Sequence, residues 1–316
     1  MVVSYAPTVG INKDGEELYV IDPSSGKRTG EINDRLAADV DAIITGNESD
    51  SVQWVDAATI EETGIAVPVY YDQRTIESYE DELRNTWPTF GTVTLGDLID
   101  SKRLSITGGH GSPSADVRTG SVPYIKVSDL RAGQVNINPT NRVSEVVARR
   151  YWKGSESGLK PFDLITPART SKNIGDIAVL MPGQERVVLT KEMLVIRPGP
   201  EADFDPFYLL WAMSLKAVRR QWQRIVFMQT NREDTGQRYR EISIPMAPDR
   251  AQRDAAAEPF RRYYEGTAAL REQFLAYLTQ DEHHHVFLAS AAATEEEAEE
   301  AASGPDVTST ASEDVE

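Results

Sequence analysis

The feature of this sequence that most constrains its fold is a stripe of mostly large apolar side chains in residues 251–282. The stripe is spaced by 3, 4, 3, 4 and 3 residues and consists of Phe260, Tyr263, Thr267, Leu270, Phe274 and Tyr277. A period of 3.5 keeps one face of a helix turned toward a partner helix, so the pattern predicts a long helix with a coiled-coil-like seam. Pro259 lies near its start, where it can introduce a kink. The seam packs either on the chain's own domain or against another chain, and both interpretations stay open.

The segment before this helix is rich in short strands. Between Phe90 and Ile244, apolar runs separated by turn residues predict strands at 93–95, 122–127, 163–166, 177–180, 186–189 and 193–196. Asp205-Pro206 is typical of a helix start, because proline suits the first turn, and predicts a helix from Phe207 to about Gln223. Short strands mixed with such a helix predict a compact α+β domain.

The first part of the chain has a different pattern. Turn signals at 12–15 and 22–26 surround the apolar run 18–21 and predict a small hairpin. Residues 34–45 and 75–85 are expected to form short helices. Residues 67–71 are expected to form an edge strand, because Pro68 cannot donate to a central ladder.

Charge is segregated along the chain. The net charge is −17. Residues 1–100 hold 20 Asp/Glu and 6 Lys/Arg, a net of −14, and residues 291–316 hold 9 acids and no base. Residues 101–290 hold 21 acids and 27 bases, a net of +6. A basic middle between acidic ends suits a DNA-binding module with non-binding segments attached, because phosphate contact needs local positive potential. The alternative is that these charges only solvate surfaces.

The remaining composition points to an ordinary globular chain. It has 316 residues, 40% hydrophobic content and no cysteine. We expect no membrane span and no secretory signal, because no apolar run of sufficient length or suitable N-terminal pattern occurs. These features fit a cytoplasmic protein. The tail from residue 289 onward is dominated by Ala, Glu, Ser and Thr, and is expected to be disordered because it has almost nothing to bury.

The sequence contains no pattern that predicts a catalytic or metal centre. His283, His284 and His285 are consecutive, so on a helix they would point in different directions, and His110 has no nucleophile pattern around it. Asp205-Pro206-Phe207-Tyr208 differs from the Asn/Asp-Pro-Pro-aromatic motif of adenine methyltransferases, because its second proline is missing. No glycine-rich turn for S-adenosylmethionine precedes it, so we interpret it as a helix start.

Several motifs in the strand-rich segment resemble the target-recognition domain of type I restriction–modification specificity subunits. Gly120-Ser-Val-Pro-Tyr-Ile-Lys-Val-Ser-Asp-Leu130 is similar to an early motif of that domain. Leu159-Lys-Pro-Phe-Asp-Leu-Ile165 is similar to another, although Phe162 occupies a position where that family usually has glycine. Ala168-Arg169, Asn173-Ile174-Gly175, Asp205 to Leu210, Ile244-Pro245 and Gln252 follow in the family's order. The resemblance covers roughly residues 90–282.

The N-terminal segment resembles a different family. Pro7-Thr8-Val9-Gly10, Lys13-Asp14-Gly15 and Asn33-Asp34-x-Leu36 are similar to the last segment of the catalytic subunit of large bacterial adenine methyltransferases. The two resemblances imply four regions. These are a methyltransferase-tail-like segment at 1–89, a recognition domain at 90–248, a spacer or dimerisation helix at 249–288, and a disordered acidic tail at 289–316.

The resemblance implies a fold and a function. The fold is a twisted mixed β-sheet with flanking helices, followed by the long helix. The function is that of a non-catalytic specificity subunit that binds double-stranded DNA and directs a partner adenine-N6 methyltransferase, which would bind S-adenosylmethionine. This chain is expected to bind no cofactor and no metal. A second copy of the chain and a restriction nuclease are further possible partners.

Candidate DNA-contacting residues follow from residue chemistry, since Arg and Lys suit guanine edges and Asn and Gln suit adenine edges. The candidates are Lys126, Ser128, Arg169, Thr170, Ser171, Lys172, Asn173, Asn231, Arg232, Gln237 and Arg238, with Arg219, Arg220 and Arg224 suited to phosphates. Phe260, Tyr263, Leu270, Phe274 and Tyr277 are the candidate partner-helix interface. Three rival functions stay open: an enzyme with an unrecognised centre, the recognition part of a split methyltransferase in another phage-defence system, and a DNA-mimicking inhibitor of restriction.

Overall fold

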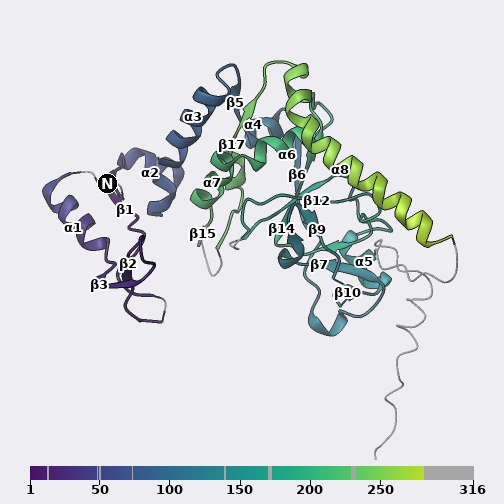
Figure 1. Ribbon diagram of the computed structural model, residues 1–316, viewed down its shortest axis with the longest axis horizontal. Helices are drawn as coiled ribbons and strands as arrows, with labels where there is room; N and C mark the ends of the chain where they lie inside the picture. The colour runs from purple at the N-terminus through teal and green to yellow at the C-terminus, as the bar shows by residue number, and fades with distance from the viewer. Residues whose placement is uncertain are drawn as a thin grey trace, which may run out of the picture. The chain divides into compact units, whose positions relative to one another are not determined.

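The computed structural model describes residues 1–280 except 13, 48, 50, 73, 139, 170–172 and 229–232, and without the side chains of 227, 228, 233 and 234. The chain forms two compact units, Met1–Trp87 and a second unit that begins at Pro88 (Figure 1). The predicted tail and His283, His284 and His285 lie outside the described residues. No helix in the described part of the chain is both long and apolar enough to cross a membrane.

The first unit combines two small sheets with three helices. Strand β1 (Val2–Ser4) pairs antiparallel with β4 (Val52–Trp54), and β2 (Tyr19–Ile21) pairs antiparallel with β3 (Arg28–Ile32). The helices are α1 (Leu36–Thr45), α2 (Ala57–Thr63) and α3 (Arg74–Thr86), with the 3₁₀ helix η1 (Pro68–Tyr71). The predicted hairpin and the two predicted helices are confirmed.

The predicted edge strand at 67–71 is wrong. Pro68 is instead the first residue of η1. A proline ring holds φ near the helical value and lacks only an N–H that the first turn leaves unbonded, so it is as compatible with a helical turn as with a strand edge. Tyr71 is buried, and its hydroxyl lies 2.9 Å from Thr63 Oγ1. The burial of Tyr71 and its contact with Thr63 hold residues 67–71 in a helical turn.

The second unit is built on a six-stranded mixed sheet. Its strand order is β6 (Leu104–Gly108), β14 (Met193–Pro198), β11 (Leu164–Pro167), β12 (Ala178–Val179), β9 (Gln134–Val135) and β8 (Leu130–Arg131). The pair β12–β9 is parallel and the other neighbouring pairs are antiparallel. The expected mixed β-sheet with flanking helices is therefore confirmed.

Three smaller sheets complete the second unit. The first has the order β10 (Arg142–Val143), β7 (Val122–Ile125) and β13 (Val188–Leu189). The others pair β5 (Gly91–Thr94) with β17 (Ser243–Met246) and β15 (Phe227–Met228) with β16 (Glu233–Asp234). Short helices are α4 (Leu95–Asp100), α5 (Glu145–Trp152), η2 (Ala115–Val117), η3 (Val127–Asp129) and η4 (Arg238–Glu241). Each segment predicted to be a strand between Phe90 and Ile244 contains one, although several observed strands are shorter.

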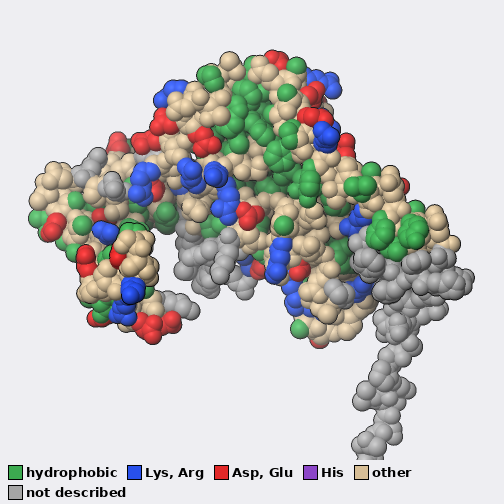
Figure 2. All heavy atoms as spheres, in the orientation of Figure 1, with side chains coloured by type: hydrophobic (Ala, Val, Ile, Leu, Met, Phe, Trp, Pro, Cys, Tyr) green, Lys and Arg blue, Asp and Glu red, His purple; other side chains and the backbone are tan. Residues whose placement is uncertain are grey.

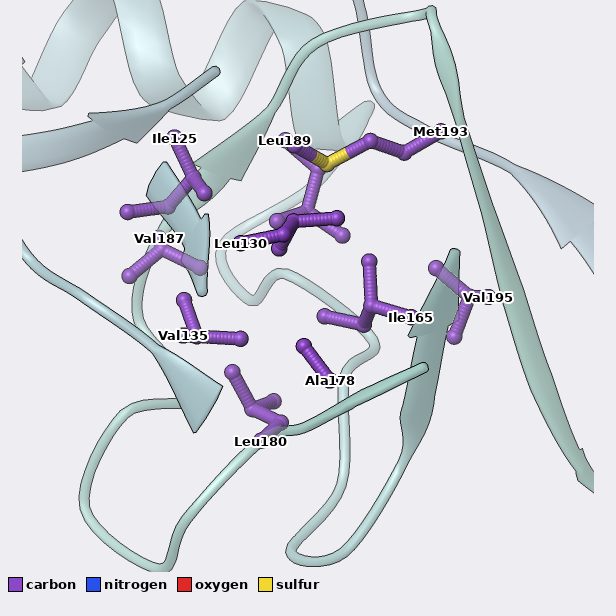
Figure 3. Close-up of a cluster of buried hydrophobic side chains, with 10 residues drawn as sticks. All are labelled: Ile125, Leu130, Val135, Ile165, Ala178, Leu180, Val187, Leu189, Met193 and Val195. Atoms are coloured by element: carbon purple, nitrogen blue, oxygen red, sulfur yellow. The ribbon is translucent and has the colours of Figure 1, made fainter. Parts of the chain in front are cut away.

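One hydrophobic cluster of the second unit lies between the three-stranded and six-stranded sheets. Figure 3 shows its side chains pointing toward one another: Ile125, Leu130, Val135, Ile165, Ala178, Leu180, Val187, Leu189, Met193 and Val195. Ile125 and Leu189 come from the smaller sheet, whereas Ile165 and Met193 come from the larger one. Burying a side chain of this size contributes about 1.5–3 kcal/mol. The cluster therefore joins the two sheets into one rigid support.

The predicted single helix from Phe207 to Gln223 is two helices, α6 (Pro206–Ser214) and α7 (Lys216–Ile225). Asp205 caps α6 by accepting a hydrogen bond from the backbone N–H of Tyr208 at 2.9 Å, as its interpretation as a helix start predicts. Leu215 interrupts the helix with an extended backbone, φ −61° and ψ 136°. The reason is packing: α6 is apolar on nearly every side and is buried, whereas α7 has one apolar and one charged face.

The predicted long helix is α8 (Arg250–Leu278), and it continues through Pro259. It is fixed to the second unit by Arg261, which forms an ion pair with Asp205, and by Tyr264, whose hydroxyl donates to Gly133 O at 2.9 Å. The face that packs inward carries Arg253, Ala257, Tyr264 and Leu278, which are buried.

Most of the predicted seam lies on an exposed face of this helix. Tyr263, Leu270, Phe274 and Tyr277 are 55%, 68%, 40% and 55% exposed. Phe260 is partly buried. The larger part of the seam is thus exposed in this chain, and the partner-helix interface stays a prediction.

Candidate nucleic-acid interface

Three of the segments predicted to contact DNA meet on the second unit. The backbone N–H of Thr235 donates to Ala168 O at 3.0 Å, which joins the segment after β11 to the 229–240 segment. Arg238 Nε donates to Ile225 O at 2.8 Å, which joins the 229–240 segment to the end of α7. Arg219 Nε lies 2.6 Å from Asp176 Oδ1, which joins α7 to the loop after Asn173. The fold therefore collects segments that are up to about 70 residues apart in sequence.

The loop after β11 is partly described. Arg169 Nη1 lies 2.5 Å from Glu192 Oε1, and its side chain is 24% exposed. Asn173 Nδ2 donates to the carbonyls of Val127 and Leu130 at 3.3 and 3.2 Å, so its amide hydrogens hold two backbone segments together. Thr170, Ser171 and Lys172 lie outside the described residues. Of the described residues of this loop, Arg169 is the one with a cationic group at the surface.

The α7 helix presents cations on its outer face. Val218, Trp222 and Ile225 are buried on the inner face, which leaves Arg220 exposed on the opposite side. Figure 2 shows Lys and Arg side chains gathered over α7. Arg224 is only 13% exposed, and its Nη2 lies 3.2 Å from Glu241 Oε2. Arg220 is therefore the most accessible of the three arginines predicted to bind phosphate, and Arg219 is intermediate with an exposure of 39%.

The 229–240 segment contains one buried and one exposed candidate. Gln237 is exposed, and its Oε1 accepts a hydrogen bond from the Tyr239 hydroxyl at 3.0 Å. Arg238 is buried, and its bond to the last carbonyl of α7 is typical of a structural arginine at a helix C-terminus. Asn231 and Arg232 lie outside the described residues.

The two remaining candidates lie in the motif after Gly120. Lys126 Nζ lies 2.6 Å from Asn141 Oδ1 and is partly buried. Ser128 is exposed, and it lines an open groove of about 700 Å³ together with Asn173, Asp176, Phe260 and Tyr264. The groove runs from the loop around Asn173 to the inner side of α8. It thus adjoins the loop that carries the predicted base contacts.

Two glycines of the resembled motifs have physical reasons to be glycine. Gly120 has a φ of 143°, and a Cβ there would lie 2.4 Å from Ser144 N. Gly175 has a φ of 77°, and a Cβ there would lie 2.8 Å from Trp222 Cδ1. Only glycine adopts such angles without strain and lets two segments approach so closely. Gly175 therefore sets the separation between the loop after β11 and α7.

Phe162 occupies the position where the resembled motif usually has glycine, and its backbone conformation is unusual for a phenylalanine. Its φ is 64°, which is the left-handed conformation that glycine adopts most easily. The backbone is therefore left-handed at this position although the residue is phenylalanine. Its ring packs on Phe207, with ring centroids 5.1 Å apart. This contact offsets part of the backbone strain.

Burial shifts the pKa values of two residues in the second unit, Asp163 and His110. Burial raises the pKa of Asp163, although Arg197 Nε lies 2.8 Å from its Oδ1. Burial also lowers the pKa of His110, whose Nδ1 accepts from the Leu189 N–H at 2.9 Å and whose Nε2 lies 2.9 Å from Ser157 O. His110 thus joins strand β13 to the loop around Ser157. Within the described residues, no group of three His, Asp or Glu side chains could hold a metal ion.

Two exposed lysines beside the candidate segments, Lys216 and Lys191, were not among the sequence candidates. Lys216 begins α7 and lies one helical turn from Arg220. Lys191 lies in the turn before β14, next to Glu192, whose carbonyl accepts from the Ala168 N–H at 2.8 Å. The spacing of four residues from Arg220 could have identified Lys216. No local signal could have identified Lys191, because its position depends on a tertiary contact.

Comparison with known proteins finds similar solved structures. No family model and no curated protein matches this chain. The solved HsdS subunit from Thermoanaerobacter tengcongensis is similar at 15% identity and a TM-score of 0.37, over 72% of this chain and 51% of the other. The S subunit of the type I restriction–modification system from M. genitalium is similar at 11% identity and a TM-score of 0.35, over 67% and 48%.

A third similar chain belongs to a structure that describes complex assembly and conformational transition of the type I R-M system. It is 14% identical with a TM-score of 0.37, over 77% of this chain and 55% of the other. The present chain thus spans about half the length of the solved S subunits that it resembles.

Proposed function

We propose that this chain is a non-catalytic specificity subunit that binds double-stranded DNA and directs a partner adenine-N6 methyltransferase to its target site. The observation that carries the proposal is the hydrogen bond between Thr235 and Ala168, which brings the two predicted base-contacting segments together at one edge of the domain. The cationic outer face of α7 adjoins the same edge through Arg219 and Asp176. The motif order from Gly120 to Gln252 supports the same function.

The contacts divide the candidate residues by role. Arg220 is exposed on a helix, which suits a phosphate contact that is independent of sequence. Arg169 lies at the surface where a loop leaves a buried strand, which suits a contact to a base edge. Its ion pair with Glu192 would have to open for such a contact. Four further candidates donate hydrogen bonds to acceptors within the protein and are proposed to support the face: Arg238, Asn173, Lys126 and Arg224.

The phosphate part of the proposal is tested by salt. Replacing Arg220 by alanine should weaken binding to all duplexes alike, and should reduce the slope of log affinity against log salt by about one unit, because one fewer counterion is released. Arg250→Ala is the matched control, because Arg250 is an exposed helical arginine on a different helix. Fluorescence anisotropy at several salt concentrations measures both slopes. Equal slopes for the Arg220→Ala variant and the unmodified complex would reject the phosphate contact.

The sequence-specific part is tested by methylation. Arg169→Ala or Lys172→Ala should cost about 1–3 kcal/mol on the cognate site and relax the choice at one base pair, with a smaller change in non-specific binding. The assembled methyltransferase complex is used, and methylated motifs are determined by sequencing. If both variants methylate the original motif with unchanged affinity, the loop is not a base contact and the 229–240 segment is the remaining candidate.

Two experiments separate the proposed function from two of its rivals, the enzyme and the DNA-mimicking inhibitor. Calorimetry on the isolated chain should detect no S-adenosylmethionine binding, whereas stoichiometric binding would identify an enzyme. A DNA-mimicking inhibitor would not bind bare duplex DNA, because its own charges replace the phosphates. Binding of duplex DNA by the assembled complex, lost with the cationic face, would therefore exclude the inhibitor.

A further inference from the structure

Helix α5 presents a cationic face that its own domain does not cover. The buried side of this helix packs on the three-stranded sheet through Ala148 and Trp152. With about 3.6 residues per turn, the opposite side carries the residues that we call the α5 surface: Val146, Arg149, Arg150 and Lys153. Val146 is 79% exposed, the largest exposed fraction among the large hydrophobic side chains that the structure describes.

The charges on and around the α5 surface leave it positive. Residues 141–160 hold five bases and two acids, a net of +3, and the neighbouring residues 111–121 and 185–186 each add one acid and one base. Both acids of 141–160 already form ion pairs: Glu145 with Arg149 and Arg186, and Glu156 with Arg186. Arg150 and Lys153 are exposed, and neither has an acidic partner in the part of the chain that the structure describes. These two cations are therefore available to an anionic group.

The end of α8 lies beside the lobe that carries the α5 surface. Leu275 of α8 lines one groove together with Gly183. Arg186 follows Gly183 by three residues, so their Cα atoms are at most about 11 Å apart, and Arg186 contacts α5 through its ion pair with Glu145. Figure 1 shows the end of α8 and helix α5 on the same side of the second unit. The chain that continues after Leu278 therefore starts close to the α5 surface.

The segment that follows α8 has the charge that complements the α5 surface. Residues 291–316 hold nine acids and no base, and five of these acids are glutamates within residues 295–300. The connecting residues 279–294 span at most about 55 Å when fully extended. A segment joined to the surface that it binds acts at an effective concentration in the millimolar range. Charge and tethering together select this acidic segment over a free anionic partner.

The cationic face of α7 lies farther from this segment. Ser214, which precedes the first residue of α7 by two positions, lines a groove together with Phe260. Phe260 lies 18 residues before Leu278 in α8, which is about 27 Å along the helix axis. The acidic segment thus leaves α8 at the end away from α7, and the α5 surface is the cationic face within easier reach.

We infer that the acidic segment 295–300 docks on the α5 surface of its own chain and shields the cations there from other polyanions. The carboxylates pair with Arg150 and Lys153, and the alanines among residues 291–302 are small enough to lie on Val146. The consequence for DNA rests on the proposed function. Under that function, the phosphates of a duplex compete with the carboxylates of this segment, so the chain carries its own competitor for one cationic face.

The docking is tested on the full chain with a photo-crosslinking benzoylphenylalanine in place of Val146. Unlabelled and heavy-isotope-labelled chains are mixed and irradiated at low salt, and mass spectrometry identifies the joined peptides. The main product should join position 146 to residues 291–302 of the same molecule. Changing the five glutamates of 295–300 to glutamine should reduce the yield at least fivefold. The matched control changes the other four acids of the tail to amides and should keep the yield: Asp306, Glu313, Asp314 and Glu316.

Two outcomes of the crosslinking would overturn the docking. The first is a main product with another molecule, or with residues outside 281–316. The second is an equal yield from the glutamine variant and the unmodified tail. Neither outcome depends on DNA, so the proposed function stands in both cases.

The shielding is tested by binding of a non-cognate duplex, measured by fluorescence anisotropy at low salt. The glutamine variant of 295–300 should bind at least threefold more tightly than the unmodified chain. This gain should disappear when Arg150→Gln and Lys153→Gln are also present, because the shielded cations are then gone. Arg250→Gln with Arg262→Gln is the matched control background, since both arginines are exposed on α8, and it should keep the gain.

An equal gain in both backgrounds would show that the tail acts through its overall charge, and would overturn the shielding of the α5 surface. An unchanged affinity of the glutamine variant would overturn it as well. If neither the chain nor the assembled complex binds any duplex, the proposed function fails, whereas the crosslink still decides whether the segment docks.

Discussion

The two units use apolar residues in opposite ways. Among the described residues of Met1–Trp87, four hydrophobic side chains are buried, whereas ten large ones are exposed. Among those from Pro88 onward, 44 are buried and five large ones are exposed. The second unit therefore has a core of its own, whereas the first is held largely by hydrogen bonds and small sheets. A unit that exposes more large apolar groups than it buries is typical of one that folds against a partner.

The difference also appears in how each unit treats buried charge. The first unit buries Asp39 with serine hydroxyls as its hydrogen-bond partners. The second unit places its buried or half-buried charges at the edges of an apolar core, where Arg197 pairs with Asp163 and Arg261 pairs with Asp205. Losing one partner of a buried polar group costs more when little apolar packing remains to hold the structure. The two units should therefore respond differently to single substitutions.

The largest loss of stability is expected from the substitution Asp39→Ala. It leaves three hydroxyls without their acceptor, which should cost on the order of 3 kcal/mol. Because the first unit buries so few apolar side chains, we expect residues 1–87 to lose protection from hydrogen exchange while the second unit keeps it. Mass-spectrometric hydrogen exchange measures both units in one sample. Asp41→Ala, on the exposed side of the same helix, is the control. If α1 keeps its wild-type protection from hydrogen exchange in the Asp39→Ala variant, the first unit does not depend on this buried carboxylate as the comparison of the two units predicts.

The next largest effect is expected on the exposed stripe of α8. Replacing Leu270 and Phe274 by Glu should leave a folded chain that assembles about 30-fold more weakly, because a buried interface anchor contributes about 2 kcal/mol or more. Sedimentation velocity measures the assembly, and circular dichroism measures the fold. Leu278→Glu is the matched control, because Leu278 is 4% exposed and its replacement should unfold the helix. If the double variant unfolds as well, the stripe belongs to the core of the second unit.

A smaller effect is expected at Phe162, where backbone strain and packing oppose each other. Phe162→Gly and Phe162→Ala both remove the contact with Phe207, but only glycine relieves the left-handed backbone. The glycine variant should therefore be about 1 kcal/mol more stable than the alanine variant. Urea unfolding of the second unit measures the difference. Equal stabilities would show that the turn relaxes when the ring is removed.

The smallest effect on stability is expected from a change of pH. This change should affect the second unit and leave the first unchanged. Because burial lowers the folded-state pKa of His110 below its ordinary value of 6.5, the unfolded chain binds more protons between the two values. The second unit should therefore lose stability as pH falls below about 6.5, whereas the first unit contains no histidine. Unfolding followed by hydrogen exchange at pH 7.5 and 5.5 tests this. His110→Gln should reduce the difference, and an unchanged pH dependence would show that other groups dominate.

The sequence by itself determined the elements whose signals are local. The hairpin around residues 18–21, the cap at Asp205 and the long periodic helix are encoded by neighbouring residues, so turn, capping and spacing rules predict them. The motif order also predicted the mixed sheet of the second unit. Pro68 was ambiguous, because one proline fits a strand edge and a helical turn equally well.

The tertiary structure decided which face of each element is used. Residue types showed that Arg220 and Arg238 are both cationic, but only packing placed the first at the surface and the second inside. The seam and the buried face of α8 both carry tyrosine and leucine side chains. Contacts with distant residues choose between the two faces, as the hydrogen bond from Tyr264 to Gly133, 131 residues away, shows. The break at Leu215 and the inward turn of Asp39 likewise depend on distant neighbours. Burial is a property of the whole packed unit, so no local pattern contains it.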